Sequence, residues 1–229
     1  MQKSEVLAQI RAIGVVPVLH LSSARDVLAM AEALHSAHID AVEIPLDMPD
    51  SLSVISTLVQ RFDEKVLVGA GSVLDAESAS TVIAAGASFV TSPSCDPEVV
   101  KYCNATDVAV FPGGLTPTEI VSAWRAGADM VKVFPCSALG GPSYLKALKA
   151  PLPQIDLLPS GGVTLQNAAA FIEAGACALW VGNDLIDVAS LREGRADRIA
   201  ERARLFMELV RDARGDAPTP PPAKVNPRP

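Results

Sequence analysis

Residues 129–135 read Asp-Met-Val-Lys-Val-Phe-Pro, a short apolar run with one lysine in its middle and a proline at its end. The run follows Gly127, which stands just past a segment of helical character, so the sequence predicts a strand directly after a helix. Side chains alternate along a strand, which places Val131 and Val133 on one face and Lys132 on the other. Both faces are covered in an all-parallel sheet, and in that setting Lys132 lies inside the protein.

Two roles for Lys132 fit such a strand. Burial disfavours an ammonium ion, so a desolvated lysine gives up its proton more easily, and the free amine can attack a carbonyl carbon to form a Schiff base. Alternatively, the stem of the side chain packs along a strand edge while the amine reaches solvent. The choice between these roles depends on the rest of the chain.

On either side of this run, strand-like and helix-like segments alternate almost throughout the chain. Further strands are expected at residues 15–19, 40–44, 66–68, 88–91, 108–111, 155–158 and 178–181. Pro97 and Pro117 each stand at the first position of an expected helix, where proline is favoured. The even spacing of about eight β/α units predicts an α/β protein, a (β/α)8 TIM barrel with an extra N-terminal helix over residues 2–13. A doubly wound open sheet is the alternative.

The barrel is expected to be a single domain over residues 1–214. With 229 residues, of which 49% are hydrophobic and 20% charged, the chain is long enough to bury a large core. No Gly- or Pro-rich linker interrupts the pattern before residue 215, where a proline-rich segment begins that cannot pack a core. We therefore expect residues 215–229 to be a flexible C-terminal tail without catalytic residues.

Composition narrows the choice of partners and location. A net charge of -7 without a basic stripe argues against binding to nucleic acid or to an anionic membrane. No apolar run approaches the roughly 20 residues of a membrane span, and the N-terminus lacks a signal-peptide core, so a cytoplasmic protein is expected. The four cysteines lack C-x-x-C spacing and are expected to be reduced thiols. The three histidines lack metal-site spacing, so neither a metal nor another cofactor is expected.

Glu43 is a second candidate for the barrel interior. If Val42 and Ile44 face the helices, then Glu43 faces inward and points into the same space as Lys132. The two charges could form a structural ion pair, although such a pair is costly to desolvate. Alternatively, the carboxylate moves protons between the intermediates of a Schiff-base reaction.

Three of the glycine-containing turns that follow expected strands are candidates for ligand binding. Ser160-Gly161-Gly162 and Gly182-Asn183 come after the last two, where barrels commonly bind phosphate through backbone N–H groups and a helix N-terminus. The alternative is that tight strand-to-helix turns use glycine anyway. The turn at residues 69–72 ends in a serine whose hydroxyl either contacts a ligand or belongs to a simple turn.

Four segments of the chain resemble the class I aldolases that cleave 2-keto-3-deoxy-6-phospho sugar acids, the KDPG/KHG aldolase family. They are residues 40–46 (DAVEIPL), 68–74 (VGAGSVL), 131–135 (VKVFP) and 161–164 (GGVT). The resemblance covers residues from about 14 to 190. Within the family, residues 43–46, 134–138 and 144–149 are more similar to the 6-phosphogalactonate branch than to the 6-phosphogluconate branch.

The resemblance implies a homotrimeric TIM barrel that works without a metal and cleaves a small-molecule 2-keto-3-deoxy-6-phospho sugar acid. The products are pyruvate and glyceraldehyde 3-phosphate, released through a lysine imine. By position, Lys132 is the Schiff-base residue, Glu43 the general acid and base, and Ser72 the hydroxyl near the pyruvoyl carboxylate. The resemblance assigns further residues to substrate binding: Pro93 and Phe134 as pocket wall, and Ser160, Gly161, Gly162, Gly182 and Asn183 around the phosphate.

The chain departs from the family where the substrate carboxylate is bound. The gluconate branch has an arginine four residues after the glutamate, where this chain has Asp47, and the galactonate branch has one at the end of the first strand, where this chain has His20. A carboxylate repels the group that a guanidinium binds, whereas His20 can help if protonated. Asn183 also replaces a usual serine.

These departures leave alternatives open for the substrate and for the activity. The resemblance implies 2-dehydro-3-deoxy-6-phosphogalactonate as the expected substrate, with 2-dehydro-3-deoxy-6-phosphogluconate or 4-hydroxy-2-oxoglutarate as alternatives. A phosphosugar isomerase or epimerase that forms no imine, and a relative that binds phosphosugars without turning them over, are the alternatives from other classes.

Overall fold

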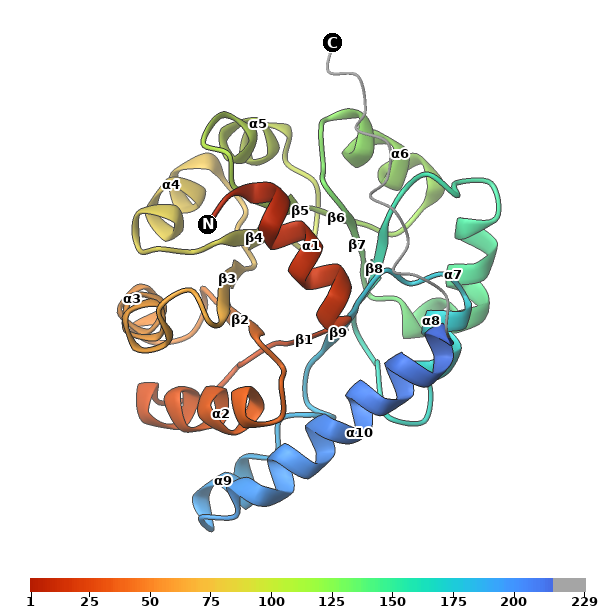
Figure 1. Ribbon diagram of the computed structural model, residues 1–229. Helices are drawn as coiled ribbons and strands as arrows, with labels where there is room; N and C mark the ends of the chain where they lie inside the picture. Colours follow the sequence, from red (N-terminus) through yellow and green to blue (C-terminus); the bar gives the residue numbers. More distant parts are fainter. Residues whose placement is uncertain (216–229) are drawn as a thin grey trace.

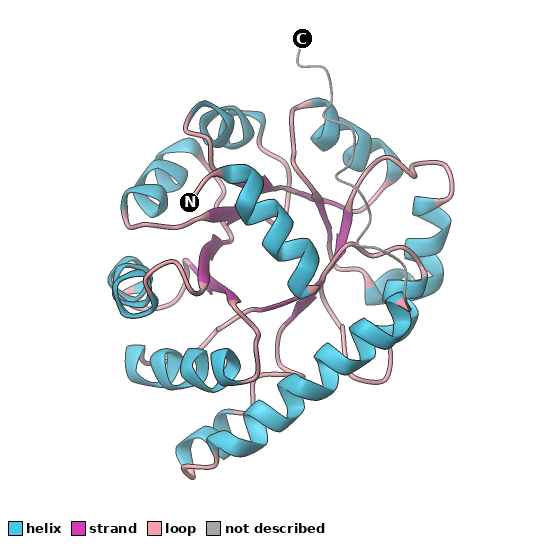
Figure 2. Ribbon diagram, viewed as in Figure 1, coloured by secondary structure: helices cyan, strands magenta, loops and turns pink. Residues whose placement is uncertain are grey.

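The computed structural model describes residues 1–215, and the rest of the expected tail, residues 216–229, lies outside the described residues. Strands form a central ring and helices surround it (Figure 1). Figure 2 shows the first helix lying across one end of this ring. This arrangement is the TIM barrel with an additional N-terminal helix that the sequence predicts.

Within the described residues, the ring consists of nine short strand segments. They are β1 (Val15–Pro17), β2 (Ala41–Pro45), β3 (Leu67–Gly71), β4 (Phe89–Thr91), β5 (Ala109–Phe111), β6 (Gly113–Gly114), β7 (Val131–Val133), β8 (Leu157–Pro159) and β9 (Leu179–Val181). β5 and β6 are separated by Pro112 alone, which has no N–H for the ladder, so they share one position in the ring. The segments therefore fill eight positions, the number that the alternation predicts.

Parallel pairing closes this ring. β2, β3, β4 and β5 form one run, β6, β7 and β8 a second, and β1 pairs with β9. Residues flanking the strands close the two remaining gaps: Leu19 N donates to Glu43 O at 2.9 Å, and Cys177 N donates to Leu157 O at 2.9 Å. Within residues 1–215 the sheet therefore has no open edge, in contrast to the doubly wound alternative.

The helices connect and cover the strands. They are α1 (Lys3–Ile13), α2 (Ala24–Ser36), α3 (Ser51–Phe62), α4 (Ala76–Ala84), α5 (Pro97–Ala105), α6 (Pro117–Arg125), the 3-10 helix η1 (Ser137–Leu139), α7 (Pro142–Lys149), α8 (Ala168–Glu173), α9 (Val188–Arg192) and α10 (Ala196–Arg214). Ser23 caps α2, since its hydroxyl accepts a hydrogen bond from Asp26 N at 3.1 Å. None of the helices of residues 1–215 combines the length and apolar character that a membrane span requires.

Helix α1 closes the N-terminal end of the barrel (Figure 2). Val6 and Ile10 belong to the same buried cluster as the inward-facing side chains of the strands. Two ion pairs attach the helix to segments next to the strands: Lys3 Nζ lies 2.8 Å from Asp129 Oδ2, and an Arg11 nitrogen lies 2.9 Å from Asp156 Oδ2. Access to the barrel interior is therefore from the C-terminal ends of the strands.

Three aromatic side chains fill the middle of the barrel, and we call Phe89, Phe111 and Trp180 the aromatic floor. Their ring centroids are 5.7 to 6.0 Å apart, with Trp180 edge-on to both phenylalanines. Gly69 on β3 makes room for them, because a Cβ at that position would lie 2.0 Å from the Phe89 ring. The floor leaves only the C-terminal layer of the barrel for polar side chains.

Candidate active site

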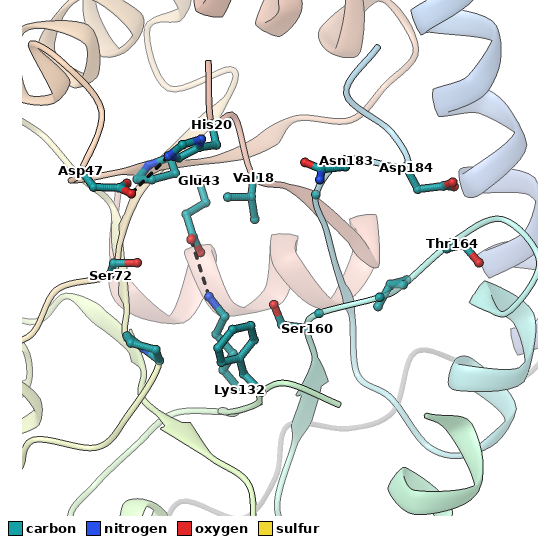
Figure 3. A pocket seen from close by; sticks show the side chains of 17 residues that line it. Val18, His20, Glu43, Asp47, Ser72, Lys132, Ser160, Thr164, Asn183 and Asp184 are labelled. Atoms are coloured by element: carbon teal, nitrogen blue, oxygen red, sulfur yellow. Dashed lines mark hydrogen bonds and ion pairs between the residues drawn. The ribbon is translucent and has the colours of Figure 1, made fainter. Parts of the chain in front are cut away.

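Lys132 and Glu43 point toward each other inside the barrel (Figure 3), and Glu43 contacts Trp180 of the aromatic floor. Lys132 lies on β7 and Glu43 on β2, and their residues are 7% and 2% exposed. Lys132 Nζ is 3.6 Å from Glu43 Oε1, farther than the about 2.7–2.9 Å of a charge-assisted hydrogen bond. The amine and the carboxylate are thus close enough to exchange protons through a bound group, and Lys132 does not reach out to solvent.

Two side chains that the sequence reasoning missed hold the other oxygen of Glu43. Thr91 Oγ1 donates to Glu43 Oε2 at 2.7 Å, and Trp180 Nε1 donates to the same oxygen. Strand alternation was a usable signal, since Thr91 faces inward like Phe89 on β4. The convergence of both donors on one oxygen becomes visible only when the ring is closed.

A cavity of about 620 Å³ opens from this pair toward the C-terminal ends of the strands. Every residue proposed from the sequence as catalytic or substrate-binding lines it: His20, Glu43, Ser72, Pro93, Lys132, Phe134, Ser160, Gly161, Gly162, Gly182 and Asn183. Asp47 lines it as well. The sequence reasoning did not anticipate the other lining residues, which are Val18, Pro45, Val163, Thr164 and Asp184. They flank the predicted residues on the same loops.

The cavity has two polar sides, separated by the Lys132–Glu43 pair (Figure 3). His20, Asp47 and Ser72 lie on one side, and Asn183 and its neighbours on the other. Ser72 directly follows β3 and has a φ of 59°, a left-handed conformation that is uncommon for a residue other than glycine. A ligand that reaches Lys132 can therefore contact both sides at once.

Phe134 and Pro93 flank the lysine as nonpolar walls. Lys132 Nζ lies 6.0 Å from the centroid of the Phe134 ring. Gly113 on β6 is the strand partner of Lys132. The Pro93 backbone lies against Gly113, so closely that a Cβ there would be 2.1 Å from the Pro93 carbonyl oxygen. Nonpolar walls of this kind limit the water that surrounds the amine.

The glycine loop after β8 is held in a left-handed shape. Gly161 and Gly162 have φ values of 84° and 82°, and a Cβ on Gly162 would lie 2.5 Å from the Ser137 side chain. Ser137 Oγ and Asn167 Nδ2 both donate to Gly162 O at 2.9 Å. Helix α8 starts only at Ala168, so the expected helix N-terminus is not at this loop, and the backbone N–H groups of the loop are the available donors.

Asp184 joins the loop after β9 to its neighbours. Its Oδ2 accepts a hydrogen bond from Leu165 N at 3.0 Å, and its Oδ1 lies 2.8 Å from an Arg202 nitrogen on α10. Arg202 thus compensates the charge of this carboxylate. The two loops that carry Gly162 and Asn183 are thereby fixed relative to each other.

His20 and Asp47 face each other at the mouth of the cavity, at 3.2 Å between His20 Nε2 and Asp47 Oδ2. Both side chains are more than half exposed. No arginine is among the described residues that line the cavity. The cavity is therefore lined by one amine, that of Lys132, and one imidazole, that of His20, beside the three carboxylates of Glu43, Asp47 and Asp184.

The thiol of Cys136 is a further ionisable group beside the site, since Cys136 N donates to Ser160 O at 2.9 Å. Cys136 follows the cis peptide bond between Phe134 and Pro135, and burial raises the pKa of its thiol to about 11. The thiol is therefore protonated at neutral pH. Among residues 1–215, no three His, Cys, Asp or Glu side chains are grouped so that they could hold a metal ion.

Several known proteins are similar to this chain both in sequence and in fold. The family model described as KDPG and KHG aldolase matches residues 6–202. The 2-dehydro-3-deoxy-6-phosphogalactonate aldolase of Escherichia coli is 38% identical over 190 residues, which are 82% of this chain and 90% of the relative. A 2-dehydro-3-deoxy-phosphogluconate aldolase of Pseudomonas aeruginosa is 36% identical over 162 residues, covering 71% of this chain and 73% of the relative.

Solved structures agree with these relatives. A structure described as native KDPGal has a TM-score of 0.80 at 36% identity and covers 87% of this chain and 95% of its own. The KDPG aldolase of Legionella pneumophila, solved with pyruvate captured as a covalent carbinolamine, has a TM-score of 0.79 at 27% identity, with 91% and 98% of the two chains covered. The chain therefore belongs to the KDPG and KHG aldolase family and is an aldolase, an enzyme of the carbon–carbon lyase class.

Proposed function

We propose that this protein is a class I aldolase that cleaves 2-dehydro-3-deoxy-6-phosphogalactonate to pyruvate and glyceraldehyde 3-phosphate, with Lys132 as the imine-forming residue and Glu43 as the general acid and base. The observation that supports this most directly is the buried Lys132–Glu43 pair at 3.6 Å beneath a cavity of about 620 Å³. A cavity of this size accommodates a small phosphosugar acid.

In the first half of the reaction, the neutral amine of Lys132 attacks the C2 carbonyl carbon of the substrate. The resulting carbinolamine loses water and becomes a protonated imine. Glu43 takes the proton of the C4 hydroxyl, the C3–C4 bond breaks, and its electron pair moves toward the imine nitrogen. Glyceraldehyde 3-phosphate leaves, and the enamine of pyruvate stays on Lys132.

In the second half, Glu43 returns a proton to C3 of the enamine, which restores the imine. Water then adds to C2 and hydrolyses the imine, so that pyruvate leaves and the amine of Lys132 is regenerated. Glu43 ends in its original protonation state. Because one carboxylate serves both proton transfers, its position relative to C3 and C4 decides the rate.

The two polar sides of the cavity suit the two anionic ends of the substrate. We assign the phosphate to the backbone N–H groups around Gly161, Gly162, Gly182 and Asn183, which line this side of the cavity. The left-handed conformation of Gly161 and Gly162 suits such anion binding. The carboxylate would face Ser72, with His20 in place of the family's arginine. Pro93 and Phe134 would enclose the reacting carbons between these ends.

The preference for the galactonate substrate draws support from the 38% identical relative and the native KDPGal structure. 2-Dehydro-3-deoxy-6-phosphogluconate and 4-hydroxy-2-oxoglutarate are the competing substrates. Coupling pyruvate release to lactate dehydrogenase and comparing kcat/KM for the three compounds tests this choice. The largest kcat/KM for either competitor would overturn the galactonate assignment.

The first test of the mechanism is borohydride reduction in the presence of pyruvate, followed by intact and peptide mass spectrometry. Wild-type protein should carry a reduced pyruvate adduct on Lys132, and Lys132→Met should carry none and lose cleavage activity. Lys146→Met on α7, an exposed lysine, is the matched control and should leave trapping unchanged. Wild type without an adduct across a range of pyruvate concentrations would contradict the imine mechanism.

We also propose that the enzyme acts in the cytoplasm as a homotrimer. Support for the location comes from the four free cysteines and from the metabolic role of its relatives. Light scattering coupled to size-exclusion chromatography tests the oligomer. A mass of one chain at micromolar concentration would contradict the trimer.

A further inference from the structure

We infer that Trp180 and Thr91 are positioning residues for the proton transfers: they hold Oε2 of Glu43 so that Oε1 alone faces Lys132 and the substrate. This inference rests on the proposed aldolase function. It concerns two side chains that have no place in the imine chemistry itself.

The two donors approach Glu43 from opposite directions around the barrel. Thr91 lies on β4, reached from β2 through β3, and Trp180 lies on β9, reached from β2 through β1. Both donate to Oε2, whereas Oε1 is the oxygen that faces Lys132. A carboxylate held by two donors on one oxygen cannot rotate without breaking both bonds.

Both donors are themselves fixed. Trp180 is 1% exposed and lies edge-on to Phe89 and Phe111 in the aromatic floor. Thr91 is fully buried. Because an indole N–H can donate but never accept, Trp180 contacts Glu43 only as a hydrogen-bond donor.

The backbone leaves space for this orientation. A Cβ on Gly71 would lie 2.0 Å from Glu43 Oε1, so the glycine on neighbouring β3 is what lets Oε1 occupy its place. Lys132, on β7, is the charged side chain in contact with Glu43, while His20, Asp47 and Asp184 line the same cavity from the loops after β1, β2 and β9.

A purely structural role would predict a different outcome. Buried carboxylates need hydrogen bonds wherever they occur, and loss of a donor then costs stability alone. A positioning role predicts that the proton transfers slow while imine formation at Lys132 continues. The two steps can be measured separately with pyruvate as the probe.

The test compares Trp180→Phe and Thr91→Val with wild type in two assays. Borohydride trapping of pyruvate reports imine formation at Lys132, and exchange of pyruvate methyl protons in deuterium oxide, followed by NMR, reports proton transfer by Glu43. We expect trapping to stay within about twofold and methyl exchange to fall by about tenfold or more in each variant, the effect of losing one hydrogen bond to a charged group.

The pH profile gives an independent readout. With one donor removed, Glu43 takes up a proton more readily, so the acidic limb of the methyl-exchange rate should move to higher pH in both variants. Thr91→Ser keeps a hydroxyl at this position, so its methyl-exchange rate and its pH profile should match those of wild type. Trp124→Phe on α6 and Thr81→Val on α4 change the same residue types outside the cavity and should match wild type.

Methyl exchange and pH profile like wild type in both variants would overturn the inference, as would trapping that falls in proportion to exchange. Thr91→Val and Trp180→Phe act on different strands, so a folding defect in one leaves the other informative. Wild-type protein that shows neither trapping nor exchange would overturn the aldolase function itself, and this inference with it.

Discussion

Residues without chemistry of their own decide where the reactive side chains lie. Glu43 Oε1 occupies space that a Cβ at Gly71 would take, and the Phe89 ring occupies space that a Cβ at Gly69 would take. The two glycines stand two residues apart on one strand, β3. Gly71 therefore makes room for Glu43, and Gly69 makes room for the aromatic floor.

Substitution of these glycines should separate activity from stability. Gly71→Ala pushes Glu43 away from its position, so kcat/KM for cleavage should fall by about 10²-fold or more, because a general acid and base is worth that much. Gly69→Ala crowds the aromatic floor and should lower the free energy of unfolding by about 1–3 kcal/mol. Steady-state kinetics and urea unfolding of both variants check this. Full activity of Gly71→Ala would show that Glu43 does not need this space.

Asp47 sets the charge at the mouth of the cavity. Its side chain is 68% exposed, so its repulsion of an anionic substrate is screened by solvent. We expect Asp47→Asn to lower KM for the phosphorylated substrate by up to about fivefold at low salt with kcat unchanged, in the range of exposed ionic interactions. The difference should shrink as salt is added.

Asp107→Asn is the control for this prediction, because Asp107 is exposed and precedes β5 at the opposite end of the barrel. Its KM should equal that of wild type. If KM of the Asp47→Asn variant is unchanged at low salt, the charge of Asp47 does not affect substrate binding.

The sequence predicted most of the site because the inward face of each strand follows from alternation. Lys132 and Glu43 could be placed in one space in this way, and the glycine loops in one region. The hydrogen bonds of Thr91 and Trp180 could not be predicted, since they join strands that are not neighbours and depend on ring closure. The His20–Asp47 contact likewise depends on the shapes of two loops.

At the level of elements, the strands and the helices with a clear start signal were predictable, whereas three short helical segments were not. The strands of the ring and the helix starts at Pro97 and Pro117 lie where their patterns indicate. Helices η1, α7 and α9 lie where no helix is predicted, since eight residues or fewer give too little of the 3.6-residue period. The split of one strand at Pro112 follows from the missing N–H of proline.

Helix α6 carries a pH-sensitive cap. Glu119 accepts hydrogen bonds from Thr116 N at 2.8 Å and Leu115 N at 2.9 Å, and these backbone donors lower the pKa of its carboxyl from 4.5. A lowered folded-state pKa means that the carboxylate stabilises the fold above pH 4.5, and that this contribution is lost as the pH falls through the folded value.

Glu119→Gln should therefore lower Tm at neutral pH, and the difference from wild type should vanish at pH values below the folded pKa. Thermal unfolding followed by circular dichroism across this range measures it. Glu201→Gln on α10 is an exposed control with no cap to lose and should show no such trend. An equal Tm difference at every pH would rule out a charge-dependent cap.

At the scale of the whole molecule, residues 1–215 leave one entrance to Lys132, because the ring of strands is closed and helix α1 covers its other end. Helix α1 closes one end, and the aromatic floor blocks the interior beneath the site. The chain carries a net charge of -7, and its cavity has more carboxylates than cations. A substrate with two anionic ends must then depend on backbone N–H groups and on Lys132, more than on long-range attraction.

The position of Trp180 has an optical consequence. The chain has two tryptophans, Trp124 on α6 and Trp180, whose indole nitrogen donates directly to Glu43. Indole emission depends on the local field, so the fluorescence of Trp180 responds to the charge of that carboxylate and to the arrival of a ligand at Lys132. A Trp124→Phe protein is thus a single-tryptophan protein, and under the proposed mechanism we expect its fluorescence to report changes in the protonation of Glu43 without a label.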